Sequence, residues 1–376
     1  MEELAAVGQA DFAMEGVARR AFFSIGSIYN RWPDREALLA DIAAERIAPA
    51  ISRRLRASTS AEEAIDWALG RGQRDVLLAA EIMLAGHTVP ALTPTAIDMW
   101  QALRGGLAER LSPSMAWYVA TSAVGSALLG AVGVPGPQPA VGRVRWFMDA
   151  CDSVGPVSSP SRTGAPEGVA VPVTPDPQGS DEVARALVDA ARVLLAERGA
   201  AGTSTRDIAA GAGVTTGALY RRYAGKSGLL ADVLLAQLEP DRYTWTWDLV
   251  QALAGTDPFS DAAQVIGQRM IDTCADVGAQ RVLLQVGIAA RNDPVLRAQV
   301  VERIRVAHEP RVEMARGLAS TGLVRGDVSP EVLVWGFQAI PVGVRATLPL
   351  AVPLDPDEVS ASLGALLRAA AARSRA

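Results

Sequence analysis

The sequence has few of the residues that build disulfides, metal sites and most catalytic centres. Its 376 residues include two cysteines, Cys151 and Cys274, and two histidines, His87 and His308. The cysteines lie far apart in the sequence, and neither residue type occurs at the spacing of metal ligands. No nucleophile with a base, cluster of paired carboxylates or glycine-rich phosphate loop is visible either. We therefore expect no metal site, no cofactor and no enzymatic activity.

Long hydrophobic runs are absent as well. No stretch of about 20 uncharged apolar residues occurs, so no segment is predicted to span a membrane. The first residues also lack the charged and then apolar pattern of a secretion signal. With 49% apolar residues, the chain can bury the cores of two domains of ordinary size. We expect a cytoplasmic protein without a membrane partner.

Positive charge is scarce, since the net charge is −5 and Lys226 is the only lysine. This balance argues against general attraction to nucleic acid, but affinity for phosphates depends on where the cations lie. Between Ser204 and Lys226 the chain carries three arginines, one lysine and one aspartate, a local charge of +3. That segment is therefore a candidate phosphate-binding surface.

Residues 152–180 separate two halves of the chain. They include six prolines and four glycines without an apolar period, which is typical of an extended or flexible linker. On both sides of this segment Ala, Leu, Val and Arg recur at three- and four-residue spacing, with little β-branched alternation. We therefore predict an all-α protein.

The two halves repeat each other. At an offset of 191 residues, "AFFSIGSIYNRWPDR" (21–35) falls on "AGVTTGALYRRYAGK" (212–226). Two further pairs of similar segments follow in the same order: 74–82 with 280–288, and 112–118 with 329–335. Units of about 200 residues are too long for a solenoid repeat, so the pattern indicates a duplicated domain. Chance agreement between Ala- and Leu-rich helices is the alternative, but the shared Gly, Tyr, Arg and Ser-Pro residues are not generic helix residues.

The second copy begins with the signals of two successive helices. A first helix is predicted over 180–199, with Ser180 as its N-cap and Gly199 as its C-terminal stop. Ser204 can cap a short second helix. Asp207, three residues later, complements the free amides and the positive end of that helix.

A tight turn and a third helix follow. Gly213 can adopt positive φ in the turn, and Thr215 can cap a third helix that runs to about Tyr223. Small residues at the start of this helix would let its N-terminus approach a surface closely. Leu219 and Tyr223 would face the core, while Tyr220 would project elsewhere. This spacing predicts helix-turn-helix geometry.

The segment "TSTRDIAAGAGVTTGALYRRYAGKSGLL" (203–230) resembles the DNA-binding region of TetR-type (tetracycline-repressor-like) bacterial transcription regulators. The resemblance implies an all-helical protein, with a three-helix DNA-binding domain and a larger helical domain for ligand binding and dimerisation. By position in the motif, four residues match sites that usually touch base edges or nearby phosphates: Arg206, Thr216, Gly217 and Arg221. Four others match sites that mostly hold the DNA backbone: Thr205, Thr215, Tyr220 and Lys226.

The first copy departs from this pattern. Its first helix is expected to be cut short, by evolution or by a misplaced start, because the offset places the start of that helix before residue 1. Phe22 stands where Gly213 makes the turn, and Glu15 stands where Arg206 would reach a base. Five positions are kept in kind and are weaker candidates for DNA contact: Ser24, Gly26, Tyr29, Arg31 and Arg35. The sequence leaves open whether the first copy binds DNA.

These patterns predict two tandem TetR-like units. The expected segments are a degenerate helix-turn-helix domain (1–45), a helical ligand-binding and dimerisation domain (46–151), the linker (152–180), a helix-turn-helix DNA-binding domain (181–236) and a second ligand-binding and dimerisation domain (237–376). TetR-type regulators normally act as homodimers that read a near-palindrome. We expect instead a monomeric pseudo-dimer on an asymmetric operator, packed within one chain through 112–150 and 329–370. A dimer of two chains is the alternative.

The remainder of each half is predicted to sense a small molecule. Side chains that could line a pocket for an apolar or aromatic effector are Trp67, Met83, His87, Trp100, Met270, Cys274 and Gln285. The alternative is ordinary core packing, and His87 fits a loop or capping role better than a metal ligand. The predicted function is a ligand-responsive regulator, a repressor that the effector releases from its double-stranded DNA operator. A helical sensor that keeps the fold without binding DNA is the alternative.

Overall fold

The computed structural model describes residues 1–134, 144–149, 181–238, 251–320, 328–347 and 356–370, except positions 147, 201, 254, 256 and 257. It also describes the single residues 136, 248, 322, 324 and 325. These residues form helices and connecting turns without a strand, so the predicted all-α fold is confirmed. They divide into two compact units. Unit 1 contains residues 1–131, 144–149 and 331–370, and unit 2 contains residues 132–134 and 181–330. The predicted linker (152–180) lies outside the described residues.

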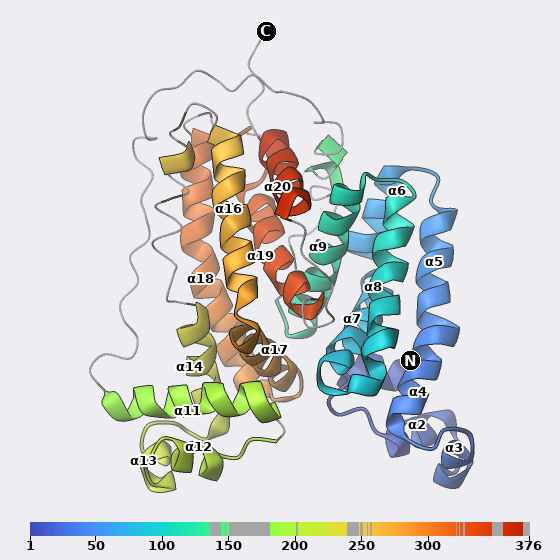
Figure 1. The fold of residues 1–376 in the computed structure, drawn as a ribbon, viewed down its shortest axis with the longest axis vertical. Coiled ribbons are helices and arrows are strands. Elements are labelled where there is room, and N and C mark those ends of the chain that lie inside the picture. Colours follow the sequence, from blue (N-terminus) through green and yellow to red (C-terminus); the bar gives the residue numbers. More distant parts are fainter. Residues whose placement is uncertain are drawn as a thin grey trace. The chain divides into compact units, whose positions relative to one another are not determined.

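Unit 1 begins with a small group of helices, which we call the first head (residues 1–42). They are α1 (Glu2–Val7), α2 (Met14–Ala21), α3 (Ile25–Arg31) and α4 (Arg35–Ile42). The side chain of Ser24 accepts from the amide of Ser27 and caps α3, and Asp34 caps α4 in the same way. A π-turn (Ala43–Ile47) continues α4 into α5 (Ala48–Ala57), which leads from the first head into a helical bundle (Figure 1).

The bundle of unit 1 is built around a buried helix. Its elements are α6 (Ala61–Asp66), a π-turn (Trp67–Arg71), α7 (Gln73–Thr88), a 3-10 turn (Pro90–Leu92), α8 (Thr93–Ala108) and α9 (Pro113–Ala131). In α7 every residue from Leu78 to Gly86 is buried. A helix that is apolar and buried on all its faces lies inside a bundle, so α7 forms the centre of this unit.

Two C-terminal helices complete unit 1: α19 (Pro330–Thr347) and α20 (Pro356–Ala370). The indole N–H of Trp335 donates to the Ser126 hydroxyl of α9 at 3.2 Å. The indole N–H of Trp146 donates to the carbonyl of Leu366 in α20 at 3.1 Å. Segments from both ends of the sequence therefore share one core.

The closest approach in this core involves two glycines. A Cβ atom added at Gly125 of α9 would overlap the carbonyl oxygen of Ala339 in α19. One added at Gly343 of α19 would overlap the carbonyl oxygen of Thr121 in α9. The backbones of α9 and α19 thus touch at a crossing that only glycine permits at these two positions.

Unit 2 also begins with a group of short helices, which we call the second head (residues 181–238). Its helices are α11 (Glu182–Arg198), α12 (Thr205–Gly211), α13 (Thr216–Tyr220) and α14 (Lys226–Leu238). Three further helices follow: α16 (Pro258–Ala275), α17 (Val277–Asn292) and α18 (Pro294–Ser320). In the described part of the chain, no helix has the length and hydropathy needed to cross a bilayer.

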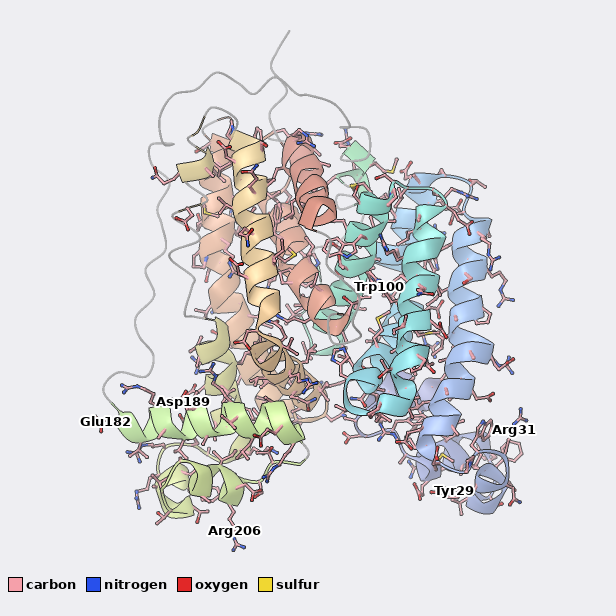
Figure 2. The ribbon with its side chains drawn as sticks, viewed as in Figure 1. Tyr29, Arg31, Trp100, Glu182, Asp189 and Arg206 are labelled. Carbon is pink, nitrogen blue, oxygen red and sulfur yellow. The ribbon has the colours of Figure 1, made fainter. Side chains whose placement is uncertain are left out.

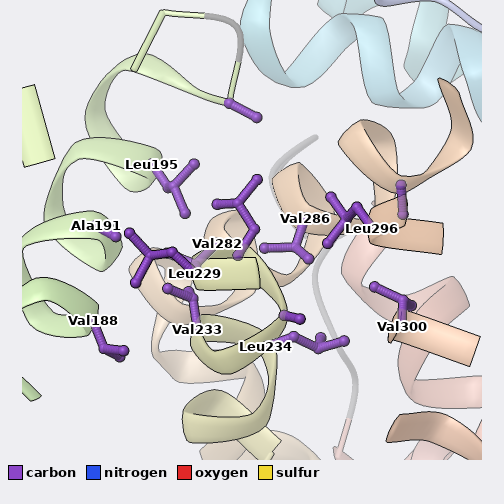
Figure 3. Close-up of a cluster of buried hydrophobic side chains, with 14 of the residues drawn as sticks. Val188, Ala191, Leu195, Leu229, Val233, Leu234, Val282, Val286, Leu296 and Val300 are labelled. Atoms are coloured by element: carbon purple, nitrogen blue, oxygen red, sulfur yellow. The ribbon is translucent and has the colours of Figure 1, made fainter. Parts of the chain in front are cut away.

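One apolar cluster joins the second head to α17 and α18 (Figure 3). Leu195 of α11 and Leu229 of α14 lie in it together with Val286 of α17 and Leu296 of α18. Leu219 of α13 belongs to the same cluster and is fully buried. The position of the helix-turn-helix is therefore set partly by the helices that follow it.

The start of α11 differs from the prediction. Asp181, and not Ser180, is the N-cap: its carboxylate accepts from the amides of Val183 at 3.0 Å and Ala184 at 3.1 Å. Ser180 itself lies outside the described residues. A carboxylate at this position satisfies two free amides and carries charge favourable to the helix dipole, which explains the preference. The predicted end of α11 at Gly199 is confirmed, with φ of 69°.

Candidate nucleic-acid interface

The second helix of the second head has a complete capping box. The amide of Asp207 donates to the Ser204 hydroxyl at 3.2 Å, and the amide of Ser204 donates to the Asp207 carboxylate at 3.0 Å. Hydrogen bonds from Ser204 hold the pKa of Asp207 below its usual range. These reciprocal bonds fix the start of α12 and confirm the caps expected from the sequence.

The turn between α12 and α13 depends on a glycine. Gly213 has φ of 68°, in the left-handed region that favours glycine, and space is open around its Cα. Thr215 then caps α13, because its hydroxyl accepts from the amide of Ala218 at 3.2 Å. The turn places α13 beside α12, and the hydroxyl groups of Thr205 and Tyr220 lie 3.2 Å apart across the two helices.

The outer side of this helix pair is polar and open to solvent. Leu219 and Tyr223 are buried beneath it, as predicted. Arg206 points away from α12 into solvent (Figure 2). The candidate residues that are exposed on this side are Arg206, Thr215, Thr216, Gly217, Tyr220 and Arg221, while Thr205 is half-buried. The structure therefore brings together these seven of the eight residues that the motif singled out.

The four cations between Ser204 and Lys226 differ in whether they are held by other groups of the protein. Arg222 is paired with the N-cap of α11, since its Nε lies 2.6 Å from the carboxylate of Asp181. Lys226 is half-buried and its ammonium group donates to the carbonyl of Ala200. Burial lowers the pKa of Lys226. Arg206 and Arg221 are exposed and, within the described part of the chain, form no ion pair, so these two arginines are the exposed cations available to a phosphate.

The sequence did not indicate the pairing of Arg222 with Asp181. The hydrogen bond from Arg222 is the main cause that lowers the pKa of Asp181. An aspartate directly before a predicted helix is a cap signal, so its place at the helix start could have been found. Its contact with Arg222, 41 residues away, depends on how α11 and α13 pack.

The first head has the same order of helices as the second head, but its turn is strained. Phe22, in the position of Gly213, has φ of 58° and is 96% exposed. A bulky residue in the left-handed region costs about 1–3 kcal/mol. Ser24, Gly26, Tyr29 and Arg31 are exposed on or beside α3, where Figure 2 shows Tyr29 and Arg31.

Two features weaken the first head as a DNA-binding surface. Arg35 is half-buried and donates to the carbonyl of Gln9 and, at 3.3 Å, to the Gln9 side chain. Glu15 is exposed where the second head has Arg206. Residues 1–45 contain eight acidic and four basic side chains, whereas residues 181–236 contain six and seven. Net negative charge around a helix-turn-helix opposes its approach to phosphates.

The predicted pocket residues lie in several places. Three of them are buried in the bundle of unit 1, namely Trp67, Met83 and Trp100, and Met270 is buried in α16. A ring nitrogen of His87 lies 2.7 Å from the carbonyl of Ala346. Gln285 accepts a hydrogen bond from the amide of Ala200. The side chain of Cys274 is outside the described residues, and a shared effector pocket stays a prediction.

Comparison with known proteins gives one family match. The family model described as "Bacterial regulatory proteins, tetR family" matches residues 187–233, a range that contains α12 and α13. Two curated proteins are 48% identical over 58 residues: the HTH-type transcriptional repressor Rv3405c of Mycobacterium tuberculosis and the HTH-type transcriptional regulator Mb3439c of Mycobacterium bovis. The match covers 15% of this chain and 31% of each relative.

A solved structure covers more of the chain at lower identity. It is NalD of Pseudomonas aeruginosa, the secondary repressor of the MexAB-OprM multidrug efflux pump. Native NalD is 22% identical, and the similarity covers 52% of this chain and 99% of NalD with a TM-score of 0.39. A putative TetR-family transcriptional regulator from Rhodococcus sp. is 17% identical over 50% of this chain and 99% of its own chain, with a TM-score of 0.40.

Proposed function

We propose that this chain, a TetR-type protein with the family's DNA-binding region at residues 187–233, regulates transcription by binding double-stranded DNA through α12 and α13. The proposal rests on which residues are exposed on the outer side of this helix pair. Arg206 and Arg221 face solvent there, beside the small residues Thr216 and Gly217 at the start of α13. A short helix with an unobstructed N-terminus and flanking arginines suits the major groove.

The chemistry of each side chain suggests its role. An arginine can donate two parallel hydrogen bonds to guanine, and a threonine methyl can contact a thymine methyl. We therefore assign contacts with base edges or nearby phosphates to Arg206, Thr216 and Arg221, with Gly217 permitting close approach. Contacts with the DNA backbone, which position the protein without specifying sequence, are assigned to Thr205, Thr215 and Tyr220.

Repression with release by a small molecule is the proposed output. A curated relative of the DNA-binding region is named a repressor. The helical bundles that follow each head are the parts of the chain large enough to enclose an apolar or aromatic effector. A helical sensor without DNA binding remains the second candidate function, favoured by the acidic first head.

The DNA-binding proposal is tested by selecting duplexes from a random library with the full chain and measuring affinity by fluorescence anisotropy. Arg206→Ala should weaken binding to the selected duplex by about 10- to 100-fold, the effect of losing one base contact. Arg305→Ala is the matched control, because Arg305 is an exposed arginine on α18 that pairs with Glu302. Failure to enrich any sequence would favour the sensor without DNA binding, whereas equal loss in both variants would contradict the base contact assigned to Arg206.

We also propose that one chain forms a pseudo-dimer through α9 and α19. Support comes from the paired contacts at the glycine crossing: Gly125 meets Ala339, and Gly343 meets Thr121. Gly343 lies 218 residues after Gly125, and Ala339 lies 218 residues after Thr121, so the two contacts are related by one offset. Contacts that repeat when the partners are exchanged are typical of a two-fold interface between equivalent surfaces.

The mass in solution distinguishes this arrangement from a dimer of two chains. Light scattering after gel filtration should give the mass of a single chain, 39.4 kDa, and a DNA complex with one chain per operator. A mass of two chains, alone or on DNA, would contradict the pseudo-dimer and favour a conventional dimer.

A further inference from the structure

The two heads share a contact that joins each one to its helical bundle. In both, the first helix ends at a glycine with nearly the same backbone: Gly8 has φ of 73° and ψ of 174°, and Gly199 has φ of 69° and ψ of 175°. The next residue is Gln9 in the first head and Ala200 in the second. Both are about 5% exposed. These two residues are equivalent at the offset of 191 that relates the heads.

The amide of this residue donates to a side chain of the bundle. The amide of Gln9 donates to the carboxylate of Glu81 in α7 at 2.7 Å. The amide of Ala200 donates to the side-chain oxygen of Gln285 in α17 at 3.0 Å. In each unit the acceptor comes from a helix that the sequence repeat also pairs, since 74–82 matches 280–288.

The carbonyl of the same residue accepts from the first residue of the fourth helix. Arg35, which begins α4, donates to the carbonyl of Gln9, and Lys226, which begins α14, donates to the carbonyl of Ala200. One peptide segment is thus held from two sides, by the bundle and by the helix that leads into it. We call this set of contacts in unit 2 the Ala200 clamp: Ala200, Gln285 and Lys226.

The Ala200 clamp lies close to the DNA-binding helices in sequence and in structure. Four residues after Ala200, Ser204 caps α12, and α13 follows from α12 through a fixed turn. Gly199 is also close to α17, because a Cβ at this position would lie 2.8 Å from the Gln285 side chain. Hydrogen bonds weaken steeply beyond about 3.5 Å, so a small displacement of α17 would open the contact.

We propose that Gln285 and Lys226 are positioning residues for DNA recognition, which couple the position of α17 to the orientation of α12 and α13 through the Ala200 clamp. The proposal rests on the proposed function, because DNA is the ligand whose affinity the clamp changes. The identity of the acceptor is not decisive, since the first head uses a carboxylate where the second uses an amide. What matters is that an acceptor is present on the bundle helix and a donor on the fourth helix.

The first test compares Gln285→Leu with Gln285→Glu in the full chain. Gln285→Leu removes the acceptor. Gln285→Glu keeps an acceptor, a carboxylate like that of Glu81 in the first unit, and is the matched control. Amide hydrogen exchange at Ala200 should accelerate about fivefold in Gln285→Leu, as expected for loss of one hydrogen bond, and stay near the wild-type rate in Gln285→Glu. Exchange at Gln9 in the same molecule is the internal reference and should not change.

The second test measures DNA affinity with a duplex selected by the wild-type chain. Gln285→Leu should weaken binding to this duplex about fivefold while binding to an unrelated duplex and its salt dependence stay unchanged. Unchanged exchange at Ala200, equal defects in both Gln285 variants, or unchanged affinity despite faster exchange would overturn the proposal. A wild-type chain that binds no duplex would refute the proposed function alone, because the exchange measurement does not use DNA.

The role of Lys226 is tested separately. Lys226→Arg copies Arg35 and should keep wild-type affinity, while Lys226→Met should weaken binding as Gln285→Leu does, with an unchanged salt slope. A slope reduced by about one unit in Lys226→Met would identify a direct phosphate contact instead and overturn the positioning role. Because Lys226 is the only lysine, amine labelling adds a direct readout: Lys226 should react faster in Gln285→Leu than in Gln285→Glu.

Discussion

Single residues in the second head show that a charge count from the sequence overstates the surface available to DNA. Of the four cations between Ser204 and Lys226, Arg222 is held by Asp181 and Lys226 by the carbonyl of Ala200. The caps at Ser204 and Thr215 were predictable, because they depend on neighbours within three residues. The partners of Arg222 and Lys226 were not, because they are 41 and 26 residues away in the sequence.

Contacts with bases and with the DNA backbone should respond differently to mutation. Thr216→Ala is expected to change sequence preference, since a methyl contact to a base discriminates between bases. Tyr220→Phe is expected to weaken binding to all duplexes about equally, since a backbone contact positions the protein without reading sequence. Binding measured across single-base variants of the selected duplex separates the two, and a changed base preference in Tyr220→Phe would contradict the assignment.

Acid should weaken the second head through Asp181. The hydrogen bond from Arg222, followed by the amide of Ala184, lowers the pKa of this carboxyl in the folded protein. A lowered folded-state pKa stabilises the protein above the unfolded value of about 3.9, and the stabilisation is lost as pH falls through the folded-state pKa. Asp181→Asn keeps an N-cap acceptor but removes the titration. The difference in melting temperature between wild type and Asp181→Asn should be present at pH 7 and shrink as the pH falls below the unfolded-state pKa, and a constant difference would exclude this cause.

At the scale of elements, the turn of the first head carries a strain that the second avoids. Phe22→Gly should stabilise unit 1 by about 1 kcal/mol, because glycine adopts positive φ without strain and the exposed ring loses little packing. Phe23→Gly is the control, since Phe23 does not have positive φ, and it should be neutral or destabilising. Thermal unfolding of both variants gives the comparison. A loss of stability in Phe22→Gly would show that the ring makes a contact worth more than the strain.

The crossing of α9 and α19 should tolerate no side chain at its centre. Gly125→Ala is expected to destabilise unit 1 by about 1–3 kcal/mol, because its Cβ would overlap the backbone at Ala339. Gly130→Ala lies in the same helix with open space around it, and should be stabilising by up to about 1 kcal/mol through helix propensity. Denaturant unfolding of the pair isolates the crossing from helix propensity, and equal effects would contradict this packing.

At the scale of the whole molecule, the two heads should contribute unequally to DNA binding. Residues 1–45 have an excess of four acidic side chains, and Glu15 stands in place of Arg206. Tyr220→Ala should therefore abolish protection of a selected operator, while Tyr29→Ala should cost much less. Footprints of the two variants side by side measure this, with half-site centres expected about 34–36 Å apart or at a multiple of it. Equal protection of two identical half-sites would contradict the asymmetry.

The all-α fold and the helix-turn-helix of the second head were predictable, because both depend on local periodicity, caps and one turn glycine. Packing between 112–150 and 329–370, the segments that contain α9 and α19, was also expected. The point at which the two helices cross was not, because it depends on Gly125 and Gly343, which a periodicity analysis treats as ordinary helix positions. Similarly, Gln285 was predicted as a side chain that could line a pocket, and its hydrogen bond to Ala200 follows from packing that sequence spacing does not encode.

The composition of unit 1 has a consequence for its synthesis. Every residue of α9 from Met115 to Ala127 is buried, partly by α19 and α20. The ribosome makes α19 about 200 residues after α9, which takes roughly 10–40 s at ordinary translation rates. During that interval the apolar face of α9 that packs against α19 stays exposed, because α19 has not yet been synthesised. A nascent chain stalled before residue 330 should therefore aggregate or recruit a chaperone, and the complete chain should become soluble only when its last helices have emerged.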